Sequence, residues 1–157
     1  MMDFNSALDV QADAVEKPPV MPQGTYVWNV SKVPTLSVSK SGEWNIVEFP
    51  LRGISAEDDV DPEELEAFGA ASAAMNKISF MSPTEEGPEG DASRQKMLYQ
   101  LKRFMQETLR VDAEDSATIR ELMNASLNCQ FLAQAVWRPS DDGQDTYIDV
   151  KNYAPLD

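Results

Sequence analysis

The sequence predicts an α+β fold, mainly β, with five strands and with helices inserted between the third and the fourth strand. Two observations predict it. Five short runs are rich in β-branched and aromatic residues and are bounded by proline, glycine or polar residues, which is the pattern of strands. Between the third and the fourth run lies the clearest helical pattern, an apolar stripe at helical spacing over residues 93–110.

The first two strands lie close together in the sequence. A turn over residues 22–24 (Pro-Gln-Gly) leads into the first predicted strand, Thr25 to Val33, which a proline ends. Residues 37–42 are polar and are expected to form a turn. The second predicted strand is Trp44 to Arg52, and Pro50 within it indicates an edge strand or a bulge.

An acidic, partly helical segment follows the second strand. In the acidic block 55–66, Asp61-Pro62 supplies an N-cap and a proline at the first helical position. The short helix that starts there is expected to end near Gly69. The third predicted strand is Lys77 to Met81, and an acidic loop over residues 82–91 follows it.

The second half of the chain holds the main helices and the last two strands. The long helix over residues 93–110 is followed by a second helix over residues 116–127, which begins with a capping box. Two strands follow, over residues 130–138 and 144–151, and residues 138–143 between them have the composition of a hairpin loop.

Three strands, a helical insertion and two strands is the element order of the OB-fold, a partly open Greek-key barrel that often binds oligonucleotides. We therefore expect one five-stranded OB-like barrel over residues 21–157, preceded by an N-terminal arm over residues 1–20 that is mobile. The extra helix after Val60 departs from this element order.

The residue composition argues against most enzyme classes. The chain has no histidine and one cysteine, which excludes histidine-based triads, cysteine–histidine pairs, the common zinc sites and an internal disulfide. A carboxylate-bound magnesium site stays open, but the acidic residues gather in segments that have the pattern of loops. We expect a protein that binds rather than catalyses, with no metal and no cofactor.

Without an apolar run of signal-peptide or membrane-spanning character, we expect it in the cytoplasm, with no membrane partner.

The net charge of −14 limits how the chain can bind nucleic acid. Such a charge repels nucleic acid at long range. Any binding must therefore come from a local patch of basic and aromatic residues that faces away from the acidic segments.

Several short motifs resemble a group of small bacteriophage single-stranded DNA-binding proteins with an OB-like core. They are the run Lys17 to Tyr26 (KPPVMPQGTY), the turn Gly42-x-Trp44, the pair Val60-Asp61, and the segments Phe131 to Arg138 and Tyr147 to Pro155. The resemblance implies sequence-tolerant binding of single-stranded DNA during phage replication or recombination, in the cytoplasm of an infected bacterium. It also implies phage replication or recombination proteins as further partners, and it leaves a homo-oligomer open.

Binding of a single strand needs aromatic faces that stack on bases and cations that follow the backbone along one groove. Strand alternation turns Tyr147 and Lys151 outward, and Trp44 and Arg52 away from the core, so these four residues are expected to form one groove. Aromatic strand residues more often pack in the core, which we expect above all for Trp28 and Trp137. The full candidate set is Tyr26, Trp28, Lys32, Lys40, Trp44, Arg52, Lys77, Phe80, Arg138, Tyr147 and Lys151.

Two other functions remain open. One is a virion component or assembly factor that binds other proteins, in which the arm and the acidic loops become ordered in the assembly. The other is an acidic mimic of DNA that blocks a host enzyme, a function that the net charge of −14 suggests. The clustering of carboxylates in predicted loops counts against the mimic, because mimicry needs carboxylates spaced over a rigid surface.

Overall fold

The computed structural model of the chain describes residues 3–156, so the first two residues of the predicted arm and the last residue of the predicted domain lie outside the described range. The strands are β1 (Gly24–Val30), β2 (Thr35–Val38), β3 (Trp44–Ala56), β4 (Met75–Pro83), β5 (Gln130–Pro139) and β6 (Thr146–Pro155). The α-helices are α1 (Phe4–Ala7), α2 (Pro62–Phe68), α3 (Pro88–Arg103) and α4 (Ile119–Ala125), with a π-helical turn at Phe104–Thr108 and 3-10 turns at Ala12–Ala14 and Ala71–Ala73. The predicted α+β class is confirmed.

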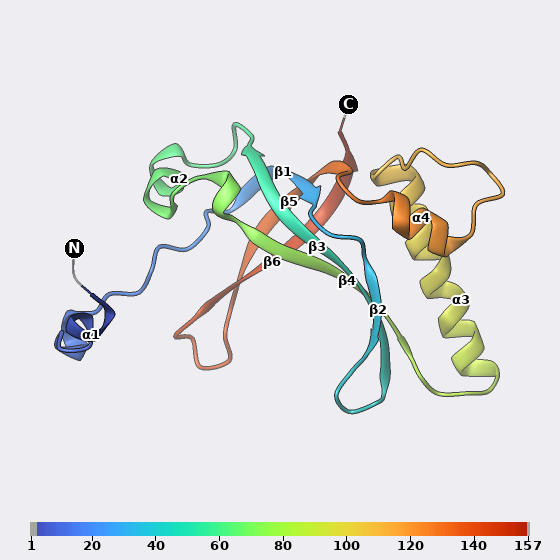
Figure 1. Cartoon of the computed structure of the whole chain (residues 1–157), viewed down its shortest axis with the longest axis horizontal. Coiled ribbons are helices and arrows are strands. Elements are labelled where there is room, and N and C mark those ends of the chain that lie inside the picture. The colour runs from blue at the N-terminus through green and yellow to red at the C-terminus, as the bar shows by residue number, and fades with distance from the viewer. Residues whose placement is uncertain (1–2, 157) are drawn as a thin grey trace.

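All six strands belong to one antiparallel sheet (Figure 1). Its order is β2-β3-β1-β5-β6, and β4 pairs with β3 outside this path. On one side of β3, residues 45–48 pair with β2 and residues 51–56 pair with β1. On the other side, residues 44–52 pair with β4. Figure 1 shows α3 and α4 together at one end of the sheet, while the chain leading to α1 leaves at the other end.

The strands differ from the sequence-based expectation in two places. Residues 37 and 38 were expected to belong to a polar turn, but residues 35–38 form β2, because the long β3 offers them backbone partners. Pro50 lies at neither an edge nor a bulge. It pairs opposite Lys77 of β4 and, on its other side, falls between the segments of β3 that pair with β2 and with β1.

The helix boundaries also shift, and they do so at particular residues. α3 begins at Pro88 instead of residue 93, so the predicted acidic loop is shorter than expected. Gly90 permits this start, because a Cβ there would collide with the carbonyl oxygen of Glu85. The helix ends in a π-helical turn, whose wider i→i+5 bonding shifts the side chains that follow it. α4 begins at Ile119, three residues later than predicted, and the predicted cap is present: the Thr118 hydroxyl accepts a hydrogen bond from the Glu121 backbone N–H at 3.1 Å.

The core lies between one face of the sheet and α3. Val47, Phe49 and Leu51 of β3 are buried, as their alternation predicted. Leu101 of α3 and Met105 of the π-helical turn are buried with them. The sheet therefore contributes every second residue of its strands to the core, and the helix contributes residues one turn apart.

The sheet is not closed into a barrel. β4 and β6 approach each other, and the side-chain amide of Asn76 donates a hydrogen bond to the carbonyl oxygen of Ile148 at 3.0 Å. The two strands nevertheless do not pair. The prediction of a five-stranded OB-like barrel is thus not confirmed: within residues 3–156 the sheet is open and has six strands. None of the helices within residues 3–156 is both long and apolar enough to cross a membrane.

Candidate nucleic-acid interface

A groove of about 540 Å³ lies where β4 and β6 face each other. It is lined by residues 76–79 of β4, by residues 147–151 and Tyr153 of β6, and by Arg138 near the end of β5. We call it the β4–β6 groove. It brings together four of the predicted site residues: Lys77, Arg138, Tyr147 and Lys151.

Strand alternation on β6 accounts for the outer wall of the groove. Val150 is buried and Ile148 is partly buried against the core, as predicted. Tyr147 and Lys151 point the opposite way, and 49% of the surface of Tyr147 is accessible. The ring of Tyr147 is therefore available to a ligand, and Lys151 lies on the same strand face.

Ion pairs hold two of the groove cations in place. The Lys77 Nζ lies 3.0 Å from the Glu48 Oε1, and the Arg138 Nε lies 2.9 Å from the Asp149 Oδ2. The Arg138 guanidinium carbon also lies 4.9 Å from the centroid of the Tyr147 ring. The hydrogen bond to Asp149 and its negative charge raise the pKa of Arg138 above the ordinary arginine value. Arg138 is therefore a permanent cation in contact with an accessible aromatic face.

The electrostatic balance of the groove differs from that of the whole chain. Its three cations, Lys77, Arg138 and Lys151, stand against the carboxylates of Glu48 and Asp149. That leaves one net positive charge in the groove, on a chain whose formal charge is −14. Exposed ion pairs are weak, so a phosphate can compete for these cations.

Trp44 and Arg52 were expected to form one groove with Tyr147 and Lys151, but neither residue lines the β4–β6 groove. Trp44, 39% exposed, lines a separate hollow with Met81 and Lys96. Arg52 lies eight residues further along β3, roughly 26 Å away at the rise of a strand. Its Nε donates a hydrogen bond to the Ser72 carbonyl oxygen at 3.1 Å.

The two remaining lysines of the candidate set lie in the connections beside β2. Lys32 is exposed in the segment that joins β1 to β2. Lys40 is exposed in the turn that joins β2 to β3. Neither lysine lines the β4–β6 groove.

Tyr26 and Trp28 are core residues and not surfaces for stacking. Both are fully buried. The Tyr26 hydroxyl donates to the Pro22 carbonyl oxygen at 2.7 Å, and the Trp28 Nε1 donates to the Ala133 carbonyl oxygen at 3.2 Å. Burial, with smaller contributions from nearby carboxylates, raises the pKa of Tyr26 to about 12. No base can reach either ring, so both residues leave the candidate set.

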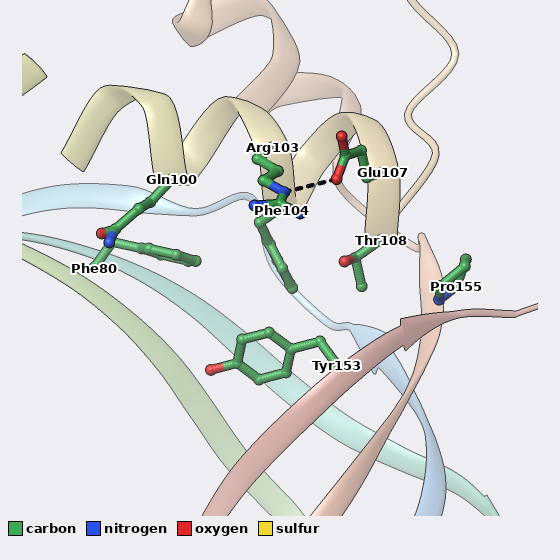
Figure 2. A pocket seen from close by; sticks show the side chains of 8 residues that line it. All are labelled: Phe80, Gln100, Arg103, Phe104, Glu107, Thr108, Tyr153 and Pro155. Carbon is green, nitrogen blue, oxygen red and sulfur yellow. Dashed lines mark hydrogen bonds and ion pairs between the residues drawn. The ribbon is translucent and has the colours of Figure 1, made fainter. Parts of the chain in front are cut away.

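A second hollow, of about 390 Å³, adjoins the groove and contains Phe80 (Figure 2). We call it the aromatic pocket. Its lining includes three rings and three polar side chains at the C-terminal end of α3: Phe80, Phe104 and Tyr153, with Gln100, Arg103 and Thr108. The centroids of the Phe104 and Tyr153 rings lie 5.3 Å apart in an edge-to-face arrangement. Lys77 joins the groove while Phe80 joins the pocket, which fits the prediction that they point to opposite faces of β4.

Tyr153 is the residue that strand alternation could not place. The pairing of β5 with β6 shifts between Leu132 and Gln134, which gives β6 one extra residue there. Asn152 takes a positive φ of 58° at this bulge, a conformation that asparagine adopts more readily than most residues. As a result Tyr153 turns toward Phe104, although simple alternation puts it on the outer face with Lys151.

The described residues contain no group of three or more histidine, cysteine, aspartate or glutamate side chains arranged to hold a metal ion. Comparison with models of known protein families, and with curated protein sequences, finds no match to this chain.

Proposed function

We propose that this chain is a non-catalytic protein that binds single-stranded DNA in the β4–β6 groove, of the kind that bacteriophages use in replication or recombination. The observation that carries the proposal is the groove itself. It gathers three cations and an accessible tyrosine in a chain of charge −14. Stacking surfaces and backbone-tracking cations along one groove are what sequence-tolerant binding of single strands requires.

The strand pairing supports an opened OB-like arrangement, which we propose as the fold. β1 and β2 pair with successive parts of β3 and so act as one interrupted first strand, which reduces six strands to five. The helices α3 and α4 then fall between the third and the fourth strand. OB-folds bind oligonucleotides on the face of their second and third strands and on nearby loops. The β4–β6 groove uses the third of these strands, β4, together with the ends of the hairpin between β5 and β6.

In the proposed complex, phosphates of the strand replace Glu48 and Asp149 as partners of Lys77 and Arg138. Lys151 binds a third phosphate. A base stacks on Tyr147, whose ring already contacts a guanidinium. These contacts involve backbone and base faces and not base edges, so binding in the groove is expected to tolerate any sequence.

An oligo-dT titration at two salt concentrations tests the proposal. Three phosphate contacts predict a slope of log K against log salt of about −2, so affinity should fall about 20-fold between about 50 and about 200 mM salt. Fluorescence anisotropy of a labelled oligonucleotide measures both affinities. An affinity that does not change with salt concentration, or tighter binding to duplex than to single strand, would contradict the proposal.

A second candidate function, protein–protein interaction, is favoured by the N-terminal arm. Residues 3–20 are exposed throughout, and Phe4 and Leu8 are 80% and 66% exposed. Apolar side chains gathered on an exposed segment are typical of a surface that binds a partner. Deleting residues 1–20 separates the two functions: oligo-dT affinity should persist, whereas an assembly that depends on the arm should be lost in analytical ultracentrifugation.

A further inference from the structure

Two backbone irregularities meet at the aromatic pocket. One is the π-helical turn Phe104–Thr108, which supplies the Phe104 ring and the Thr108 hydroxyl. The other is the bulge at Asn152, which turns Tyr153 into the pocket. π-helical turns and β-bulges are both enriched at functional sites, where they redirect side chains. Their convergence on one hollow indicates a binding site and not a packing defect.

The aromatic pocket adjoins the β4–β6 groove at Tyr153. Tyr153 lines both hollows, and Lys151 lies two residues before it on β6. β4 also runs past both, with residues 76–79 in the groove and Phe80 in the pocket. A strand whose phosphates lie on the groove cations would therefore meet the pocket where it passes Tyr153.

The chemistry of the pocket suits a nucleobase. Phe80 and Tyr153 offer aromatic surface, and 40% of the surface of Tyr153 is accessible. Around the rings, the Gln100 amide and the Thr108 hydroxyl both donate and accept hydrogen bonds, as the edge of any base requires. The one cation of the lining, Arg103, is neutralised by Glu107, whose Oε2 lies 2.8 Å from the Arg103 Nε. Figure 2 shows this ion pair at the helix end, above the Tyr153 ring.

We infer that the aromatic pocket receives one nucleobase of the single strand whose backbone lies in the β4–β6 groove. The base packs against Tyr153 and Phe80, and its edge bonds to Gln100 and Thr108. The inference rests on the proposed function and adds to it a defined position for one base.

Substitution of Tyr153 in the full chain tests the inference. Tyr153→Leu should weaken oligo-dT binding about 5- to 150-fold, the effect of losing one stacked base. The salt slope should stay at the wild-type value, because no phosphate contact is removed. Tyr153→Phe keeps the ring and should bind within about twofold of wild type. Tyr99→Leu is the matched control, because Tyr99 is an exposed tyrosine of α3 that lies outside the pocket lining.

A second variant covers the case in which Tyr153→Leu does not fold. Gln100 is exposed on α3, so Gln100→Leu should keep the native circular dichroism spectrum. Loss of its hydrogen bonds to the base should lower affinity about 2- to 10-fold.

The outcomes separate the two proposals. If Tyr153→Leu or its substitute Gln100→Leu binds as tightly as wild type, the pocket inference is overturned while the proposed function stands. A fall in the salt slope with Tyr153→Leu also overturns the inference, because the residue would then act through phosphate contacts. If the wild-type chain itself does not bind oligo-dT, the proposed function is overturned together with the inference.

Discussion

The double variant Lys77→Glu/Lys151→Glu is expected to lose at least about 50-fold in affinity for oligo-dT at about 50 mM salt. Each lost phosphate contact removes the release of one counterion, which corresponds to roughly eightfold at that salt concentration. The salt slope should fall from about −2 to about −0.7, since Arg138 alone would still meet a phosphate. Anisotropy titrations with labelled oligo-dT at two salt concentrations measure both quantities.

Two controls separate a local effect from an effect of net charge. Lys17→Glu/Lys102→Glu makes the same change in total charge at exposed lysines outside the groove lining, and should lower affinity far less. Asp149→Asn changes charge in the opposite sense within the groove and frees Arg138, so it should raise affinity severalfold. Equal losses in the two double variants would mean that the β4–β6 groove is not the binding site.

Phe104→Ala is expected to lower the free energy of unfolding by about 3–5 kcal/mol. Phe104 is buried at the end of α3, and its ring centroid lies 5.1 Å from that of Phe49 and 5.5 Å from those of Phe80 and Phe131. Such aromatic pairs add stability beyond the area that they bury. Removing the ring leaves a cavity between the sheet and the helix and breaks several pairs at once.

Urea denaturation followed by circular dichroism measures this loss. Phe104→Leu fills most of the space and should lose less than Phe104→Ala, because part of the buried surface is kept. Phe4→Ala, at a phenylalanine that is 80% exposed, should change stability by no more than about 0.5 kcal/mol. If Phe104→Ala is as stable as Phe4→Ala, the aromatic cluster does not hold α3 on the sheet.

Local sequence patterns were sufficient for most of the fold. The alternation in β3 identified its core residues, and the N-cap and proline at Asp61-Pro62 located the start of α2. β2 could not be predicted, because its residues 35–38 are all exposed and become a strand through pairing with β3. Trp137 was expected in the core and is 41% exposed. Its Nε1 instead donates to the Met21 carbonyl oxygen at 2.7 Å, a contact between segments far apart in the sequence.

The candidate site was only partly predictable, for similar reasons. Alternation placed Tyr147 and Lys151 correctly on the outer face of β6, because the strand is regular up to that point. It could not have placed Tyr153, which lies beyond the predicted strand and after the bulge at Asn152, where the extra residue reverses the alternation. Alternation also says nothing about distance along a strand. Trp44 was therefore grouped with Tyr147 and Lys151 of β6, although it pairs with the C-terminal end of β4 and they lie beside residues 76–79.

Amide chemical-shift mapping by NMR with oligo-dT locates the ligand on the chain, and so it tests whether the β4–β6 groove is the binding site. If single strands bind there, the largest shifts are expected at residues 76–79 and 147–153, on both sides of the β4–β6 groove. Residues near Trp44, at the opposite end of β4, should change little. Shifts centred on residues 39–44, or binding without shifts in residues 147–153, would show that the strand binds outside the groove.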